Sequence, residues 1–312
     1  MGLKTLQERE SRLALYMLAP ALVIVLLLVF FPTAWNIWLS LKPVSLEGLR
    51  GEGLWNAGLT LRNYQKVLSD PELPGVAATT LAYTVGGSLF SILLGLTAAL
   101  LVHKEFPGRA FIRGLLISPY IAPIVAVAFT WSFILDPQLG CLNWLGVKTG
   151  VLDQPVAFFS ARWIQVRLPG FTMPIPLALL SVIFFEGWRY FPFALLFILA
   201  RLQAIPEDLY RAAAVDGAGP FQRFFHITLP QLRSVLATLF LFRFIWTLNK
   251  FDDIFLLTGG EAGTRVLTLK VYDYAFGAFD IGAGSAAAML LFFILGIFMA
   301  GYLRWVTRQE VR

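Results

Sequence analysis

Four long stretches of the chain contain no Asp, Glu, Lys or Arg. They are residues 13–41, 75–102, 114–135 and 281–303. A helix needs about 20 mainly apolar residues to cross the hydrocarbon core of a bilayer, so each stretch is predicted to be a transmembrane helix. The low share of charged residues agrees with this prediction, because only 14% of the 312 residues are charged, whereas about 25% are charged in soluble chains. The sequence therefore predicts an all-α membrane protein.

Two further apolar stretches carry ionisable residues. One, near residues 176–201, contains Glu186 and Arg189, and the other, near residues 232–252, contains Arg243. With these two, the chain is predicted to form six transmembrane helices, near residues 14–41, 75–102, 112–135, 176–201, 232–252 and 281–304. They form one transmembrane domain (14–305), and the terminal segments 1–13 and 306–312 are predicted to lie outside the bilayer.

The distribution of Lys and Arg predicts the orientation of these spans. Segments 1–12, 103–113, 201–233 and 304–312 together carry 13 basic residues in 65 positions, whereas the alternate segments 42–74, 136–175 and 250–280 carry 10 in 104. Basic residues concentrate in cytoplasmic loops, so both termini are predicted to be cytoplasmic. The three sparser segments face outward, either as aromatic anchors at the membrane surface or as a docking surface for an external partner.

The cytoplasmic segment 204–230 predicts two short helices that lie against the membrane. Pro206 suits a first helical turn, and Glu207 and Asp208 place negative charge at the helix N-terminus, where the helix dipole favours it. Gly217 tolerates the left-handed conformation that commonly follows a helix. The pattern alone is compatible with an ordinary interfacial helix and with a surface for a partner.

The residues of this segment resemble a known motif. The sequence Arg-Ala-Ala-Ala-Val-Asp-Gly-Ala occupies positions 211–218, and Ile-Thr-Leu-Pro occupies 227–230. This closely resembles the EAA loop of permease subunits of ATP-binding-cassette (ABC) importers. Residues 131–143 and 251–272 are similar to the same regions of the MalF-type sugar permeases. The resemblance implies the type I ABC importer permease fold, with the loop forming a coupling helix that docks into an ATP-binding subunit.

The resemblance also implies which residues make that contact. They are Glu207, Asp208, Tyr210, Arg211, Ala212, Ala213, Asp216, Gly217 and Ala218. The chain departs from the family motif at its first position, where Arg211 replaces the usual Glu. Either Glu207 or Asp208, one turn earlier, takes the ionic role of that Glu, or the contact rests on shape alone.

The ionisable residues inside the spans fall in one layer. At about 1.5 Å per helical residue, Glu186, Arg189 and Arg243 all lie near the membrane midplane. Glu186 and Arg189 are three residues apart, so they share a helix face and are expected to neutralise each other. Two interpretations stay open, a structural ion pair and a lining of the translocation path. For the second, the candidate path residues are Glu186, Arg189, Tyr190, Arg243, Trp246, Asn249 and Asp252.

The sequence contains no motif for ATP binding, metal binding or nucleophilic catalysis. No Gly-x-x-x-x-Gly-Lys-Ser/Thr loop for ATP is present, so ATP and Mg are expected on a partner ATPase and no cofactor on this chain. No metal-ligand or nucleophile pattern occurs, and the chain is predicted not to be an enzyme. The basic residues are scattered singly, which argues against nucleic-acid binding. The single Cys141 excludes an intramolecular disulfide.

The resemblance implies a complex in the plasma (inner) membrane of a prokaryote. Its other members would be a second, MalG-like permease, a dimer of ATP-binding subunits and an external solute-binding protein or lipoprotein, all in membrane lipid. The expected function is to form half of the path for a sugar, such as a maltose- or trehalose-type disaccharide, by ATP-driven alternating access. The alternatives are import of glycerol phosphate or a polyol by the same fold, and a non-ABC secondary transporter.

Overall fold

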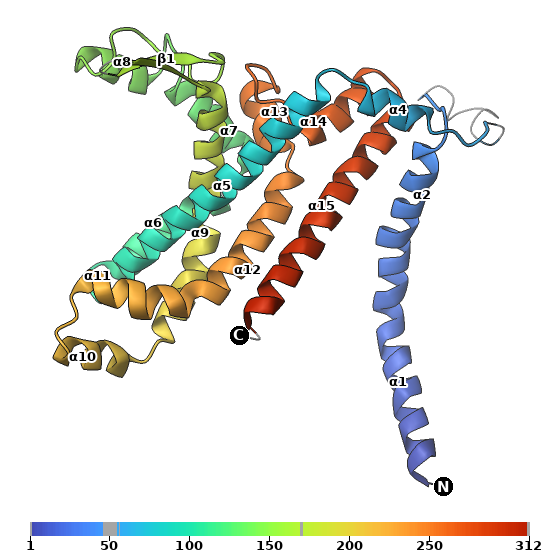
Figure 1. The fold of residues 1–312 in the computed structure, drawn as a ribbon, viewed down its shortest axis with the longest axis horizontal. Helices are drawn as coiled ribbons and strands as arrows, with labels where there is room; N and C mark the ends of the chain where they lie inside the picture. The colour runs from blue at the N-terminus through green and yellow to red at the C-terminus, as the bar shows by residue number, and fades with distance from the viewer. Residues whose placement is uncertain (1, 46–54, 56, 169–170, 311–312) are drawn as a thin grey trace. The chain divides into compact units, whose positions relative to one another are not determined.

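The computed structural model describes residues 2–45, 55, 57–168 and 171–310 (Figure 1). Positions 1, 311 and 312 of the predicted terminal segments lie outside this part of the chain. The described residues form two compact units, residues 1–71 with 270–293 (unit 1) and residues 72–269 with 294–312 (unit 2). The helices, in chain order, are α1 (Gly2–Val25), η1 (Leu26–Phe30), α2 (Phe31–Ser40), α4 (Arg62–Leu68), α5 (Leu73–Val102), α6 (Arg109–Ile121), α7 (Ile124–Ile134), α8 (Cys141–Lys148), α9 (Leu177–Gln203), α10 (Glu207–Val215), α11 (Pro220–Arg223), η3 (Phe224–Thr228), α12 (Leu229–Leu248), α13 (Asp252–Thr258), α14 (Leu267–Tyr272), η4 (Asp273–Gly277) and α15 (Ile281–Glu310).

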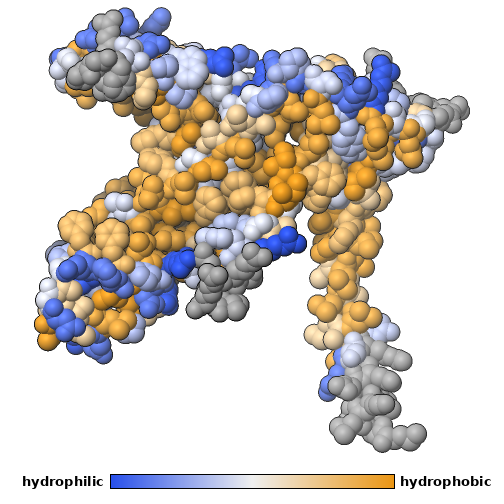
Figure 2. Space-filling view, in the orientation of Figure 1, coloured by the Kyte–Doolittle hydropathy of each residue, from blue (hydrophilic) through white to orange (hydrophobic). Residues whose placement is uncertain are grey.

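Helices of membrane-spanning length and composition occur where the sequence predicts them. Five single spans are present in the described chain, Leu13–Ser40, Leu73–Val102, Leu177–Gln203, Pro220–Leu248 and Ile281–Val306. The bent pair α6 and α7 makes a sixth if it is counted as one span. Apolar side chains cover the surface along α2 and along α1 from Leu13 onward (Figure 2). The fold is therefore the expected helical membrane fold.

The third span differs from its prediction, because it is not one continuous helix. Helix α6 ends at Ile121, α7 begins at Ile124, and the two are bent by 97°. Pro123 has no backbone N–H with which to continue the helix, and the residue before a proline is driven toward extended conformations. Ala122 accordingly has ψ of 142°.

The core of unit 2 is built on the close contact of α5 with α9. Small residues permit this approach, which is typical of helix packing in membranes. A Cβ on Gly95 would lie 2.6 Å from the Cβ of Ala194, and one on Gly187 would lie 2.1 Å from the ring of Phe90. Helix α12 packs against both, and buried residues such as Leu239 complete the core.

Residues 136–175 contain a feature that the sequence analysis did not anticipate. Strands β1 (Ile164–Leu168) and β2 (Phe171–Ile175) form an antiparallel hairpin in which Ile164 faces Ile175. The hairpin lies outside the spans, at the same end of unit 2 as α8 (Figure 1). The expected all-helical membrane domain therefore carries a small β element in a connecting segment.

Unit 1 combines an isolated apolar helix with a small packed region. None of the apolar window of Leu13–Ser40 is buried within the chain. At its end, Leu39 and Val44 pack with Trp35 and Trp38, and the Trp38 ring lies 5.3 Å from that of Trp55. Aromatic side chains therefore gather at this end of the helix.

Candidate functional site

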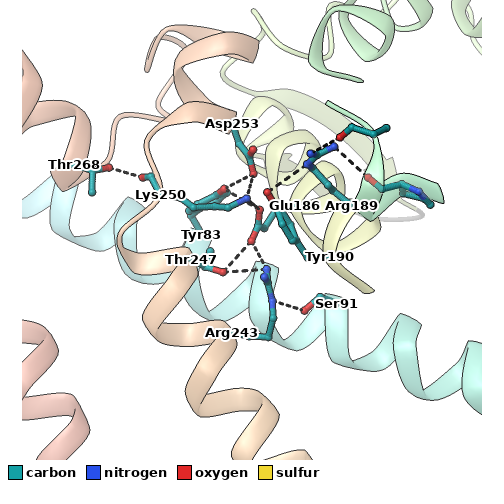
Figure 3. Close-up of polar contacts among 12 residues, drawn as sticks. Tyr83, Ser91, Glu186, Arg189, Tyr190, Arg243, Thr247, Lys250, Asp253 and Thr268 are labelled. Atoms are coloured by element: carbon teal, nitrogen blue, oxygen red, sulfur yellow. Dashed lines mark hydrogen bonds and ion pairs between the residues drawn. The ribbon is translucent and has the colours of Figure 1, made fainter. Parts of the chain in front are cut away.

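A cluster of charged side chains is buried in unit 2, where α5, α9, α12 and α13 meet (Figure 3). Glu186 forms ion pairs with Arg243 and with Lys250, whose Nζ lies 2.7 Å from Glu186 Oε2. The same Nζ lies 2.6 Å from Oδ2 of Asp253. The Tyr83 hydroxyl donates to Glu186 at 3.4 Å and to Asp253 at 3.3 Å. Two carboxylates therefore balance two cations.

Hydroxyl groups complete the cluster. Thr247 Oγ1 donates to Glu186 Oε1 at 2.9 Å, and Arg243 Nε donates to Ser91 Oγ at 3.2 Å. Asp253 Oδ1 has no hydrogen-bond partner among the described residues. Glu186 and Arg243 are 0% and 1% exposed, and charges inside a membrane protein are tolerated when they are paired in the bundle interior. The burial of Glu186 and Arg243 favours a structural role for their ion pair over a lining of the translocation path, because neither side chain is accessible in the described chain.

Arg189 does not have the partner that the sequence analysis expected. No ion pair joins it to Glu186 in the described part of the chain, and the two side chains point in different directions (Figure 3). Arg189 instead donates to the carbonyls of Pro119 (3.1 Å) and Ala122 (2.8 Å). The expected mutual neutralisation is therefore wrong. The three-residue spacing permits the pair, but cations from α12 and the segment after it reach Glu186 instead.

The ring of Tyr190 lies among three cations. Lys250 Nζ is 3.4 Å from the ring centroid, and the guanidinium carbons of Arg243 and Arg189 are at 4.6 and 5.5 Å. A cation over an aromatic face is attracted by the ring quadrupole, more strongly where water is excluded. The Tyr120 ring also meets the Tyr190 ring edge-on, with the two centroids 5.9 Å apart. Tyr190 thus connects the buried cluster to a partly exposed aromatic region.

Trp246 belongs to this aromatic region. It is 43% exposed and lies 4.9 Å from the ring of Phe193 and 5.8 Å from that of Phe242. Asn249, one turn later, is also exposed, and its amide donates to the Ile245 carbonyl at 2.8 Å. Flat aromatic faces beside hydrogen-bonding groups are suited to sugar rings.

The candidate path residues therefore separate into two sets. Glu186, Arg189 and Arg243 are buried, whereas Tyr190, Trp246, Asn249 and Asp252 are partly or fully exposed. The path role of the second set stays a prediction.

Five members of the buried cluster are not among the residues predicted from the sequence, namely Tyr83, Ser91, Thr247, Lys250 and Asp253. Lys250 and Asp253 directly follow an apolar span, where charged residues usually mark the membrane surface. Their spacing of three residues was the available signal, but it does not by itself indicate burial.

Of the two short helices predicted in segment 204–230, the first is present as α10, whereas the second is not separate, because the helix that begins at Pro220 continues through η3 and α12 to Leu248. Helix α10 begins directly after Pro206 and ends before Asp216. Gly217 has φ of +78°, and the Ala218 amide donates to the Ala213 carbonyl at 2.8 Å. This six-residue closure is the Schellman ending, in which a left-handed glycine reverses the chain.

The charges of α10 are paired within the helix. Arg211 Nη2 lies 2.8 Å from Glu207 Oε2, and Nη1 lies 3.8 Å from Asp208 Oδ1. All three side chains are more than two-thirds exposed. Arg211 thus neutralises Glu207 and Asp208, the two acidic residues that could take the ionic role of the usual Glu. The docking role of these residues stays a prediction.

The inner side of α10 is tethered to the following helix. The Tyr210 and Thr228 hydroxyls are 3.0 Å apart, and Thr228 directly precedes α12. Two apolar side chains of the segment are exposed, Val215 at the end of α10 (88%) and Phe221 in α11 (81%). This segment lies at the opposite end of unit 2 from α8 (Figure 1). Among the described residues, no group of three or more His, Cys, Asp or Glu is placed to hold a metal ion.

Comparison with known proteins agrees with this arrangement. The chain is 32% identical over 302 residues to the trehalose/maltose transport system permease protein MalF of Thermococcus litoralis, covering 96% of this chain and 95% of that one. It is 32% identical over 283 residues to the trehalose transport system permease protein SugA of Mycobacterium tuberculosis, covering 91% and 85%. A chain of a bacterial alginate ABC transporter, solved with an alginate pentasaccharide-bound periplasmic protein, has the same fold, with a TM-score of 0.75, 20% identity and coverage of 94% and 93%.

The family match covers most of the region described above. Residues 91–310 match the family described as the binding-protein-dependent transport system inner membrane component. The matched region contains α9, the charged cluster of α12 and α13, and the α10–α11 pair. The chain therefore belongs to this family and is a multi-pass permease subunit of an ABC importer.

Proposed function

We propose that this chain forms half of a translocation path for a sugar and is driven by a separate ATPase. The observation that carries the proposal is the α10–α11 segment, which is exposed and whose sequence at 211–218 resembles the coupling loop of importer permeases. Its partners would be a second, MalG-like permease, two ATP-binding subunits and an external solute-binding protein. Both termini and the α10–α11 pair would lie on the cytoplasmic side of a prokaryotic inner membrane.

The tether between α10 and α12 supports a mechanical role. Movement of α10 by the ATPase pair would be transmitted through Tyr210 and Thr228 to α12. Helix α12 carries Trp246 on its exposed face and Arg243 in the buried cluster. The mechanism would be alternating access, in which ATP binding turns the path outward to receive solute and hydrolysis resets it.

The charge balance favours a neutral sugar. Glu186 and Asp253 neutralise Arg243 and Lys250, and backbone carbonyls hold Arg189. The cations around Tyr190 are therefore already engaged, which leaves them poorly suited to an anionic solute. The trehalose and maltose systems named for the relatives point to a disaccharide. Glycerol phosphate and polyols are the alternative solutes of the same fold.

Reconstitution of the complex in liposomes tests the function. The subunit should co-purify with an ATPase, and uptake of a labelled neutral disaccharide should require ATP and the solute-binding protein. A panel of trehalose, maltose, glycerol phosphate and a polyol identifies the solute. Uptake driven by an ion gradient, with no ATPase recovered, would instead indicate a secondary transporter.

Substitution of the exposed set tests the path. Trp246→Ala, Asn249→Ala and Asp252→Ala are expected to lower the initial rate of sugar uptake, with Trp246→Ala lowering it about tenfold because a stacking surface is lost. Trp305→Ala is the matched control, since Trp305 is 51% exposed in α15, just beyond the predicted span 281–304. Unchanged uptake in all three variants would rule out this path.

A further inference from the structure

The break between α6 and α7 leaves backbone acceptors that the helices themselves cannot satisfy. In a continuous helix the Pro119 carbonyl would accept from the N–H of residue 123, but Pro123 has none. The last bond of α6 runs from Ala122 N to Ser118 O at 3.2 Å, and the first of α7 runs from Val127 N to Pro123 O at 3.1 Å. The carbonyls of Pro119 and Ala122 thus lie at the gap.

Arg189 of α9 occupies this gap. Its Nη1 donates to the Pro119 carbonyl at 3.1 Å and its Nη2 to the Ala122 carbonyl at 2.8 Å. Arg189 is 6% exposed, and Pro119 is buried. Buried backbone carbonyls are almost always hydrogen-bonded, so one guanidinium provides the donors that the break removes.

The location also accounts for the charge of Arg189. The end of α6 presents the negative end of a helix dipole, which favours a cation. The Tyr190 hydroxyl accepts a hydrogen bond from Arg189 Nε at 3.3 Å, and the Tyr190 ring lies 5.5 Å from the guanidinium carbon. Within the described residues, carbonyl oxygens and this tyrosine surround the guanidinium, and no ion pair joins it to Glu186.

The break determines what lies beside Tyr190. Tyr120, two residues before the gap, meets the Tyr190 ring at 5.9 Å. Beyond the gap, Val127 of α7 packs in a cluster with Ile254 of α13. We propose that Arg189 is a positioning residue, which takes the place of the missing Pro123 amide, holds the 97° break and thereby keeps Tyr120 against Tyr190. The part that concerns transport rests on the proposed function.

Distance measurement tests the holding role without any transport assay. In a Cys141→Ser background of the purified complex, spin labels are attached at Phe111→Cys and Phe129→Cys, two exposed positions on either side of the break. A straight helix would separate the two backbones by about 27 Å, and the bend makes this distance shorter. Pro123→Ala alone should keep the short distance, because Arg189 remains. Pro123→Ala with Arg189→Met should lengthen it toward the straight value.

Arg189→Met alone should broaden the distance distribution, and Arg189→Lys should retain the short distance in part. If Pro123→Ala with Arg189→Met keeps the wild-type distance, packing rather than Arg189 holds the break and the proposal is wrong. The same conclusion follows if Arg189→Met leaves the distribution unchanged. These results do not depend on uptake, so they are independent of the proposed function.

A double-mutant cycle tests the link to Tyr120. Arg189→Met and Tyr120→Ala should each raise the KM for sugar uptake several-fold, and the double variant should be no worse than either, because coupled residues are not additive. Additive effects, or a change in maximal rate with KM unaltered, would contradict a role of Arg189 in placing Tyr120.

Discussion

Glu186→Gln is expected to remove most of the folded subunit from the membrane. The substitution keeps the size of the side chain but leaves Arg243 and Lys250 buried with only the carboxylate of Asp253 between them. Removing one partner of a buried ion pair costs about 3–5 kcal/mol, a large share of the roughly 5–15 kcal/mol that stabilises a folded protein. The measurements are the yield of subunit after detergent extraction and the melting temperature of the complex.

Glu261→Gln is the matched control for this substitution. Glu261 is 79% exposed and lies 3.5 Å from Arg265, and exposed pairs of this kind contribute about 0–1 kcal/mol. Adding Lys250→Met to Glu186→Gln should recover part of the yield, because one cation then faces one carboxylate. If Glu186→Gln behaves like Glu261→Gln, the cluster does not stabilise the fold.

Val215→Asp is expected to abolish co-purification of the ATPase while the subunit itself stays folded. Val215 ends α10 and is 88% exposed, so the substitution removes little packing within this chain. In a complex, the same position would carry an unpaired carboxylate into a protein interface, where it would lose its hydration. Disruption of an interface hot spot costs about 2 kcal/mol or more, which is at least about 30-fold in affinity.

Val151→Asp provides the same chemical change at the other end of unit 2. Val151 is 79% exposed and follows α8. It should leave ATPase recovery unchanged, and both variants should melt at the wild-type temperature in isolation. Equal ATPase recovery with Val215→Asp and Val151→Asp would show that α10 is not the contact with the ATPase.

The spans and helix α10 could be predicted because their causes are local. A run of apolar residues determines that a helix enters the bilayer, whatever lies beside it. The start of α10 at Glu207 and its end before Gly217 depend on helix-dipole and left-handed preferences of single residues. By contrast, the β1–β2 hairpin follows a weak local signal in a connecting segment, and the bend at Pro123 shows that an uninterrupted apolar run need not be one straight helix.

The charged cluster could be predicted only in part, because its partners come from different helices. Spacing along α9 puts Glu186 and Arg189 about one turn apart, but it does not say which neighbour each side chain meets. Glu186 is reached by Arg243 and Lys250 because α12 packs beside α9 with that face inward. Arg189 turns toward carbonyls that exist as acceptors only because α6 is broken.

The sequence by itself determined that the chain is a helical membrane protein, and the motif at residues 211–218 indicated the family. Those properties depend on hydropathy and on short-range backbone preferences. Only the tertiary structure decided that Glu186 is paired across helices, that Arg189 donates to carbonyls at the broken span, and that Trp246 is on an exposed face. These depend on how each helix is rotated against its neighbours, and many side chains distant in sequence together set that rotation.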